Sequence, residues 1–583
     1  MQKLQAVKQG VKYVWKLPYI DHEKNLEVAA SYTLSIPLAQ TLLTRGYANK
    51  EVIEKFLFSS YQQDVGNPEI MKDAQKAVDR IIAAIDAGEK ILIVGDYDVD
   101  GITSSSLMMS ALLPLGAHVN FYIPHRVKEG YGLSEAVVTR AADNNYKVLI
   151  TVDNGITAFG PADVAKARGV DLIITDHHRP HDHLPDAYAI VNPHQHDCPY
   201  PFKEFAGVGV IFKVLSLLYQ KKGLPIPDKA YELLLLGTVA DVVPLLGENR
   251  FWVRYGLHYA AKKESLSLQV LKHHGKCSDK KLSSTDIGFR IAPQINALGR
   301  LEDPRQGVSF LLGSDRQETE RIGNVLFQLN ETRKEIERKI FEGVDELIQN
   351  GTIDVTKERC ILAASSEWPP GVIGLVASRL VGKYGRPTML FHITKSGKAK
   401  GSCRSIAACN VFNLLEKHKD LLDQFGGHAM AAGLALDKDK LQELKARFEA
   451  ELATLLTPED LQQTLVCDAP LAMGDVTTKL MHDMQLFEPF GAQNSQPIFY
   501  MERVSLVNEP TLLKDLHVKC MVFADGIIKP LVFFNRPELY PLLVAQQEEP
   551  FSIAVQVSEN SWNGRTTVEL YGLDIAELKS MKG

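Results

Sequence analysis

The chain has 583 residues, 45% of them hydrophobic, a length and composition that predict three or four globular domains, each with its own core. A formal charge of −6 excludes a globally basic nucleic-acid binder, so any contact to phosphates must come from local patches. The seven scattered cysteines form no C-x-x-C pair, which argues against a disulfide framework and a thiolate zinc site. With neither a signal-like start nor a run of about 18 apolar residues, we expect a cytoplasmic protein without membrane contact.

Hydrophobic periodicity divides the chain into five segments. Residues 1–70 are predicted to form a helical lead-in, because apolar residues recur three and four apart. Strand-like runs alternate with helical stretches over 71–315, which is typical of a parallel sheet in an α/β domain. One long amphipathic helix is predicted over 316–350, and a second α/β domain over 351–457. The short β-prone runs of 458–583 predict a small β-barrel.

Four aspartate-bearing segments stand out within the first α/β domain: GDYDVDG at 95–101, VDNG at 152–155, TDHH at 175–178 and ADVVP at 240–244. The first three directly follow short apolar runs that are predicted to be buried parallel strands. Carboxylates at such strand ends lie at the sheet edge where α/β proteins bind ligands. Asp oxygens and His nitrogens suit Mn²⁺ or Mg²⁺, so the sequence predicts metal-assisted hydrolysis.

The first segment has two simpler interpretations. An EF-hand calcium loop also begins D-x-D-x-D-G, but its twelfth position requires a glutamate and here holds Leu107. The preceding KILIV also favours a strand over the helix that enters an EF-hand. A single aspartate after a strand can simply cap a helix. Three alternating aspartates near a His-His pair would repel one another without cations, which favours a pair of metal ions.

In this order and at these separations, the four segments resemble the motifs of the DHH phosphoesterase superfamily. The resemblance implies that Asp153 bridges two ions, Mn²⁺ or Mg²⁺, and that Asp96 is a further ligand or a support. It also implies that Asp176 fixes the imidazole tautomer of His177, and that His178 faces the phosphate. Two metal ions can activate water and stabilise the leaving oxygen, so no covalent nucleophile is needed. The implied catalytic and metal-binding residues are Asp98, Asp100, Asp153, His177 and Asp241, together with His178 in catalysis.

Further segments resemble the RecJ branch of this superfamily, whose members are 5′→3′ exonucleases specific for single-stranded DNA. They are EGYGL at 129–133, RIAPQINALGR at 290–300, GSCRS at 401–405, EWPPGVIGLVASR at 367–379 and GGHAMAAG at 426–433. The resemblance implies a parallel-sheet DHH catalytic domain, the connecting helix, a DHH-associated substrate-binding domain and a C-terminal OB-type barrel. The chain departs from the pattern at Pro369-Pro370, where a His commonly stands, and at Gln493, where a Gly is usual.

These segments supply candidate DNA contacts. A guanidinium can hold a phosphate, and an aromatic ring can stack on a base, although a lone Arg is often only a surface residue. Residues 368–415 contain no Asp or Glu but seven Lys or Arg, which favours a backbone-binding face. The candidates before the barrel are Arg126, Tyr131, Arg290, Asn296, Arg300, Ser402, Arg404 and His428.

The barrel offers candidates of its own, because OB-folds hold single strands with cationic grooves and stacking aromatic rings. They are Lys514, His517, Lys519 and Trp562, although Trp562 beside Asn563-Gly564 could instead anchor a hairpin turn.

We therefore expect an enzyme of DNA recombination and repair that removes nucleotides from the 5′ end of single-stranded DNA. Family resemblance implies single-strand-binding protein and repair helicases as partners. One alternative is a phosphodiesterase of short oligoribonucleotides or dinucleotides. Another is a non-catalytic replication scaffold.

Overall fold

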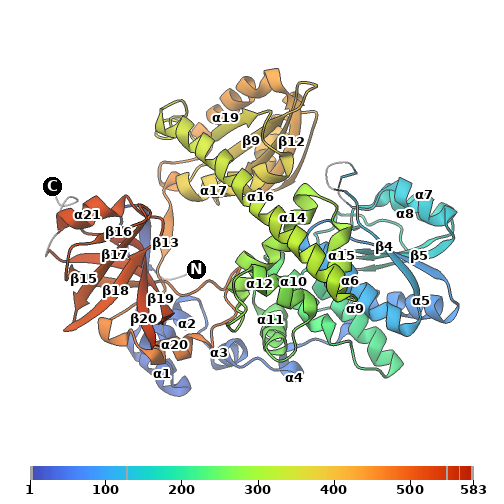
Figure 1. The fold of residues 1–583 in the computed structure, drawn as a ribbon, viewed down its shortest axis with the longest axis horizontal. Coiled ribbons are helices and arrows are strands. Elements are labelled where there is room, and N and C mark those ends of the chain that lie inside the picture. Colours follow the sequence, from blue (N-terminus) through green and yellow to red (C-terminus); the bar gives the residue numbers. More distant parts are fainter. Residues whose placement is uncertain (1–3, 126–128, 131, 547–548, 563–564, 579–583) are drawn as a thin grey trace. The chain divides into compact units, whose positions relative to one another are not determined.

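The computed structural model describes residues 4–125, 129–130, 132–546, 549–562 and 565–578 (Figure 1). The candidates Arg126 and Tyr131 lie outside the described residues. Contacts divide the chain into two compact units. The large unit comprises Ser60–Glu449 with Pro489–Asn494, and the barrel unit comprises Met1–Ser59, Ala450–Glu488 and Ser495–Gly583. Among the described residues, no helix is both long and apolar enough to span a membrane.

A five-stranded parallel sheet with the order β4-β3-β5-β6-β7 forms the centre of the large unit. Its strands are continuous apolar runs because both faces are covered. Ile91 and Ile93 of β3 pack on one face of the sheet, and Leu92 and Val94 on the other. The strands are β3 (Lys90–Val94), β4 (His118–Tyr122), β5 (Tyr146–Val152), β6 (Asp171–Thr175) and β7 (Ala189–Val191).

Helices cover both faces of this sheet, which confirms the predicted α/β class. The helices α7 (Glu135–Asp143) and α8 (Phe159–Ala167) pack on the Leu92 face. The Ile91 face is covered by α5 (Ala74–Asp86), α6 (Val99–Leu112) and α9 (Gly207–Lys222). Further helices of the large unit are α4 (Tyr61–Asp64), α10 (Lys229–Ala240), α11 (Gly247–Ala260), α12 (Leu266–His274), α13 (Ser284–Asp286), α14 (Ala292–Leu301) and α15 (Arg305–Leu312), with a π-helix at Ile287–Ile291.

The long helix α16 (Arg316–Gln349) occupies the segment where the sequence predicts a connecting helix. Asp315 caps its first turn by accepting a hydrogen bond from the backbone N–H of Glu318. Buried residues near its start, such as Leu326, belong to the core of the first sheet, and Ile340 and Val344 to the core of the second. One helix therefore contributes to both cores of the large unit (Figure 1).

The second sheet has the order β11-β12-β10-β9-β8 and is antiparallel except for the pair β8 and β9. Its strands are β8 (Ile361–Ser365), β9 (Thr388–Ile393), β10 (Lys398–Arg404), β11 (Gln424–His428) and β12 (Ala431–Asp437). The helices of this part are α17 (Pro370–Tyr384), α18 (Val411–Lys417) and α19 (Leu441–Leu455). The apolar face of α17, with Val372, Val376 and Leu380, packs in one core with α16 and β8.

In the barrel unit, the pairing of β15 with β17 closes β15, β19, β20, β18 and β17 into a barrel, as predicted. Its strands are β1 (Leu4–Gln9), β2 (Val14–Pro18), β13 (Thr464–Val466), β14 (Ala469–Pro470), β15 (Phe499–Leu506), β16 (Thr511–Leu513), β17 (His517–Ala524), β18 (Ile527–Phe533), β19 (Phe551–Trp562) and β20 (Arg565–Ala576). Its helices are α1 (His22–Tyr32), α2 (Ile36–Thr44), α3 (Lys50–Leu57), α20 (Thr478–Met484) and α21 (Leu539–Gln546).

The N-terminal segment is helical over α1, α2 and α3, as the sequence predicts, but it does not begin with a helix. It begins with the hairpin of β1 and β2, and β2 pairs in parallel with β13. Trp15 of β2 is fully buried, and its indole N–H donates to the carboxylate of Asp574, 3.0 Å away. Residues 1–59 thus belong to the same unit as the barrel.

Candidate metal centre and nucleic-acid contacts

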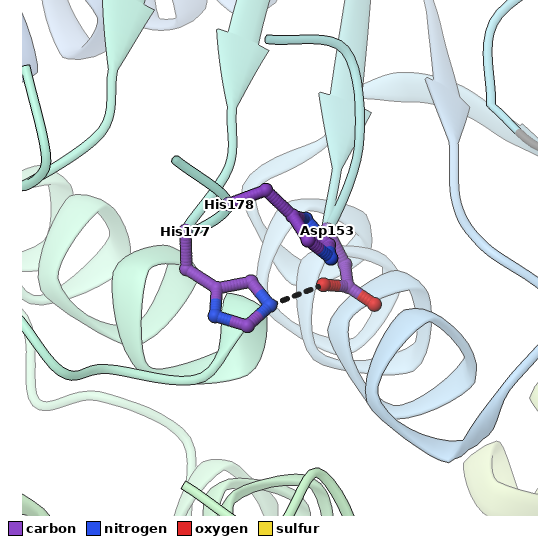
Figure 2. Close-up of side chains that lie close together, drawn as sticks. All are labelled: Asp153, His177 and His178. Atoms are coloured by element: carbon purple, nitrogen blue, oxygen red, sulfur yellow. Dashed lines mark ion pairs between the residues drawn. The ribbon is translucent and has the colours of Figure 1, made fainter. Parts of the chain in front are cut away.

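The four aspartate-bearing segments meet at the carboxyl edge of the parallel sheet. Asp153 follows β5, His177 follows β6, and Asp241 ends α10. Figure 2 shows the imidazole of His177 turned toward the carboxylate of Asp153, with His178 beside it. The Nε2 atom of His177 lies 3.1 Å from Oδ1 of Asp153 and 3.6 Å from Oδ2 of Asp241. A divalent cation has nitrogen and oxygen ligands within reach at this point.

Three groups of side chains could hold metal ions, with ligand atoms within 4.8 Å of one another in each group. The groups are Asp96, Asp98 and Asp153; Asp100, His177 and Asp241; and Asp153, His177 and His178. Since Asp153 occurs in two groups, it is positioned to serve two neighbouring sites, as the resemblance implies. The third group adds His178 to the sequence-predicted ligand set.

The pKa values of these groups are also consistent with a cation site. Burial and the neighbouring Asp98 raise the pKa of Asp100 to about 7, and burial and Asp100 raise the pKa of Asp153 and Asp241 well above the usual range. Burial and the adjacent His178 lower the pKa of His177 to about 4, so its imidazole is neutral at pH 7. Among the described residues, neither Nε2 of His177 nor the buried Oδ2 of Asp241 has a hydrogen-bond partner. Cations would compensate the crowded carboxylates.

Asp100 has a second role that the sequence did not reveal. Its carboxylate, 1% exposed, accepts hydrogen bonds from the backbone N–H groups of Gly207 and Val208 at the start of α9, at 2.6 and 2.8 Å. A helix N-terminus favours such a negative charge. A Cβ atom at Gly207 would lie 2.6 Å from Cβ of Asp153, so glycine allows α9 to approach the metal centre closely.

Asp98 also makes a structural contact, because it caps α6 by accepting from the N–H of Gly101 at 3.1 Å. The helix-cap interpretation thus applies to this residue alongside its membership of a candidate metal group.

Asp176 contacts His178 and not the ring of His177, which differs from the expected tautomer control of His177. Its Oδ1 lies 2.7 Å from Nδ1 of His178 and accepts the backbone N–H groups of both histidines. Burial opposes a charge on His178, but the hydrogen bond to Asp176 and the negative charges of nearby aspartates together outweigh it and raise the pKa of His178 to about 9. Asp176 therefore orients His178 and leaves its Nε2 to face the candidate metal centre.

Ser402 and Arg404 lie together on β10. The Arg404 guanidinium donates to Oγ of Ser402 at 3.0 Å and to the carbonyl of Cys403 at 2.7 Å. A Cβ atom at Gly374 of α17 would lie within 3 Å of both side chains, at 2.8 and 2.9 Å. The fold thus presents a hydroxyl and a guanidinium next to the start of a helix, a combination suited to phosphate.

The other candidates of the large unit have varied surroundings. Arg290 is engaged by Asp286, at 3.3 Å, and by the carbonyl of Lys276. Arg300 donates to the carbonyl of Gly371, which joins α14 to α17. Asn296 is half-buried on α14. His428 is exposed at the end of β11, in a hairpin and not at a helix start.

The basic stretch of residues 368–415 is partly neutralised in the folded protein. Lys383 pairs with Asp345, and Lys398 pairs with both Asp423 and Asp437. The positive charge of this stretch available to phosphate is therefore smaller than the sequence suggests.

On the barrel, Lys514 and Lys519 are exposed, and Nδ1 of His517 accepts the N–H of Asn535 at 3.0 Å. The side chain of Trp562 lies outside the part of the chain that the structure describes. Sequence reasoning missed Phe534, which is 48% exposed and packs edge-on between His517 and Tyr571. Because Phe534 directly follows the apolar run of β18, its place in the sequence indicates a core residue.

Comparison with known proteins agrees with this architecture. Residues 90–238 match the DHH family, N-terminal domain, residues 357–454 the DHHA1 domain, and residues 467–574 the RecJ OB domain. The single-stranded-DNA-specific exonuclease RecJ of Bacillus subtilis is 36% identical over 567 residues, which cover 97% of this chain and 71% of that protein. The Escherichia coli enzyme of the same name is 34% identical over 476 residues, 78% of this chain and 82% of that protein.

Among solved structures, Thermus thermophilus RecJ in complex with Mn²⁺ superposes with a TM-score of 0.82 at 27% identity. The match covers 97% of this chain and 80% of that one. Sequence similarity over 97% of this chain, three consecutive domain matches and a shared fold lead to one conclusion: the chain belongs to the RecJ family.

Proposed function

We propose that this chain is a single-stranded-DNA-specific exonuclease that hydrolyses phosphodiesters from the 5′ end with two bound ions, Mn²⁺ or Mg²⁺. The observation that carries the proposal is the cluster of the partly buried His177 and Asp241 with the buried Asp153 and Asp100, held at the edge of the parallel sheet. The family relatives named as single-stranded-DNA-specific exonucleases support the choice of substrate.

Different residues are proposed to bind the metal ions and to contact the phosphate. When bound, two divalent cations polarise the phosphodiester and stabilise the leaving oxygen. His177 is neutral, so its Nε2 can serve as a ligand without losing a proton. Asp176 holds Nδ1 of His178, so the other ring nitrogen can donate to a phosphate oxygen. The proposed ligands are Asp96, Asp98, Asp100, Asp153, His177 and Asp241.

The 5′→3′ direction of degradation would be set by the residues that hold the 5′ end of the strand. Ser402 and Arg404 are proposed to hold the 5′ end, together with the sequence-predicted Arg126 and Tyr131. The remaining strand is proposed to contact Arg290, Asn296, Arg300, His428, Lys514, His517, Lys519 and Trp562. Residues 71–315 are proposed to form the catalytic domain, and residues 316–350 the helix that connects it to a substrate-binding domain at 351–457. Residues 458–583 are proposed to bind DNA.

The test uses labelled single-stranded and duplex DNA with Mn²⁺. Wild-type protein should degrade the single strand, and Asp153→Ala should lose that activity while keeping its fold. Asp163→Asn, an exposed change on α8, is the control and should act like wild type. Equal degradation by wild type and Asp153→Ala would remove the metal centre from the reaction.

The same family leads us to propose a cytoplasmic protein that works with single-strand-binding protein and repair helicases. The rival activity on short oligoribonucleotides or dinucleotides predicts a rate that falls steeply as the strand lengthens. Our proposal predicts no such fall. A scaffold without catalysis would not bind Mn²⁺ in calorimetry.

A further inference from the structure

A polar cavity of about 320 Å³ lies behind the loop that carries Asp153. One wall is formed by Gly132, Leu133 and Glu135, and the other by Gly155 and residues 157–161. Ligand sites in proteins begin at about 300 Å³, so this volume suits a base-sized group and not a stretch of strand. We call it the Glu135 pocket.

The Glu135 pocket and the candidate metal centre share the loop that follows β5. Asp153, at φ +62°, faces His177, and Gly155 lines the pocket at φ +109°. Directly after Gly155, the N–H of Ile156 donates to Oδ2 of Asp176 at 2.9 Å. A Cβ atom at Gly155 would lie 2.6 Å from Oγ1 of Thr151, so the sharp turn requires glycine. A group bound in the pocket therefore lies one loop away from the reacting phosphate.

The walls offer an acceptor, donors and a ring. In the part of the chain that the structure describes, neither Glu135 nor Thr157 forms a side-chain hydrogen bond or ion pair. Within the described residues, no side chain caps α8 at Ala158. The N–H of Phe159 donates to the carbonyl of Thr157, and Pro161 has no N–H, so the N–H of Gly160 is the first-turn donor that remains. Phe159 is half-buried, with its ring 4.5 Å from that of His183, and it lines the pocket.

The charge of Glu135 decides which part of a nucleotide fits. An uncapped helix N-terminus usually suits a phosphate, but a carboxylate in the same wall repels one. A nucleobase instead presents N–H donors and ring acceptors on one edge and a flat face for stacking. The carboxylate can accept from an exocyclic amino group, which adenine, cytosine and guanine carry and thymine lacks.

We propose that the Glu135 pocket receives a base of the bound strand next to the metal centre, and that Glu135 favours bases with an exocyclic amino group over thymine. This inference rests on the proposed exonuclease function and deepens it. Glu135 is thus a specificity-determining residue, and Thr157 and Phe159 complete the pocket.

The test uses single strands that are identical except for the base at each of the first three positions from the 5′ end. With wild-type protein, thymine at one of these positions should slow release by about fivefold to tenfold, which lies within the effect of one ordinary hydrogen bond. Binding of the same strands in EDTA, followed by fluorescence anisotropy, should show the same order. The readout in EDTA separates base recognition from catalysis.

Three variants test whether Glu135 causes the base preference. Glu135→Gln keeps the shape of the side chain but removes its charge, and should reduce the preference to less than twofold. Gly160→Ala places a methyl group 2.4 Å from Oε1 of Glu135, which displaces the carboxylate, and should reduce the preference in the same way. Asp163→Asn makes the same charge change as Glu135→Gln outside the pocket, and should keep the preference.

Two results would overturn the inference while the proposed function stands: equal rates and affinities for all bases with wild type, or an unchanged preference in Glu135→Gln. If wild type with Mn²⁺ degrades none of the strands, the proposed function fails, and the inference fails with it.

Discussion

Asp176 is a single residue with four contacts at the candidate metal centre. It accepts the backbone N–H groups of Ile156, His177 and His178 and bonds the ring of His178. Burial would raise its pKa, but the hydrogen bond and charge of His178 lower it, so the carboxylate stays ionised. An amide at this position could not accept all of these donors.

We therefore expect Asp176→Asn to lower activity or Mn²⁺ affinity by about 10-fold to 100-fold, the usual effect of losing such a support. Rates on single-stranded DNA and calorimetry with Mn²⁺ measure the two effects. Asp186→Asn is the control, because it removes only an exposed ion pair with Lys166. Wild-type rate and affinity in Asp176→Asn would show that His178 needs no support.

The crowded carboxylates also predict a pH dependence. In metal-free protein, burial and mutual repulsion raise the pKa of Asp100 to about 7 and raise the pKa of Asp153 and Asp241 well above the usual range. Protons then compete with the cation, so Mn²⁺ should bind more tightly at pH 8 than at pH 6 and release protons. Calorimetry in two buffers of different ionisation enthalpy measures that release.

The same shifts fix the sign of a stability change. Because these folded-state pKa values lie above those of the unfolded chain, their contribution to stability is present at low pH. It is lost as pH rises through the folded values. The metal-free protein should therefore unfold at a lower temperature at pH 8 than at pH 6, and Mn²⁺ should reverse that order. Proton-independent Mn²⁺ binding would contradict the raised pKa values.

The sequence predicted most aspartates of the site because three of the four segments follow a recognisable apolar strand, whereas Asp241 ends the helix α10. It did not predict their partners. Asp100 meets Gly207 over a separation of 107 residues, and only the packing of α9 against the sheet creates that contact. Asp176 bonds the ring of His178 because of how that ring is oriented. The order of the residues in the sequence does not determine this orientation.

At the scale of elements, the start of α9 approaches the site closely. A methyl group at Gly207 would lie 2.6 Å from Cβ of Asp153, so one of the two elements must shift. We expect Gly207→Ala to reduce activity by at least tenfold, since misplacement by about 1 Å can cost 100-fold.

Gly343→Ala is the matched control on α16, where a new Cβ atom meets nothing within 4 Å. It should leave activity unchanged and stabilise the large unit by up to about 1 kcal/mol, because alanine favours a helix interior. Activity assays and thermal unfolding of both variants test the pair. Full activity in Gly207→Ala would mean that α9 can move without harm.

Elements with strong periodicity, such as the long α16, were predictable from the sequence. The strands β1 and β2 were not. Their residues lack a clear apolar run, and β2 pairs with β13, which lies about 450 residues further along the chain. Only tertiary pairing makes this segment extended, which overrides its local pattern.

At the scale of the whole molecule, the barrel unit is assembled from three separate stretches of chain. Trp15 is fully buried, and its indole N–H donates to the Asp574 carboxylate, which is also fully buried. Trp15→Phe removes this donor and keeps most of the packing. We expect it to destabilise the barrel unit by about 1–3 kcal/mol, the cost of a buried acceptor that loses a partner.

Thermal unfolding followed by limited proteolysis of the barrel unit measures this loss. Val7→Ala, on the exposed face of the same hairpin, should change stability by less than about 0.5 kcal/mol. If Trp15→Phe is as stable as wild type, the N-terminal hairpin is not integral to the barrel unit.

The most direct test of the central claim is digestion of one single strand that carries different fluorophores at its 5′ and 3′ ends. With Mn²⁺, the 5′ label should be released first, and removal of the cation with EDTA should stop release of both labels. Release that starts at the 3′ end would contradict the polarity. Release that continues in EDTA would contradict the metal centre.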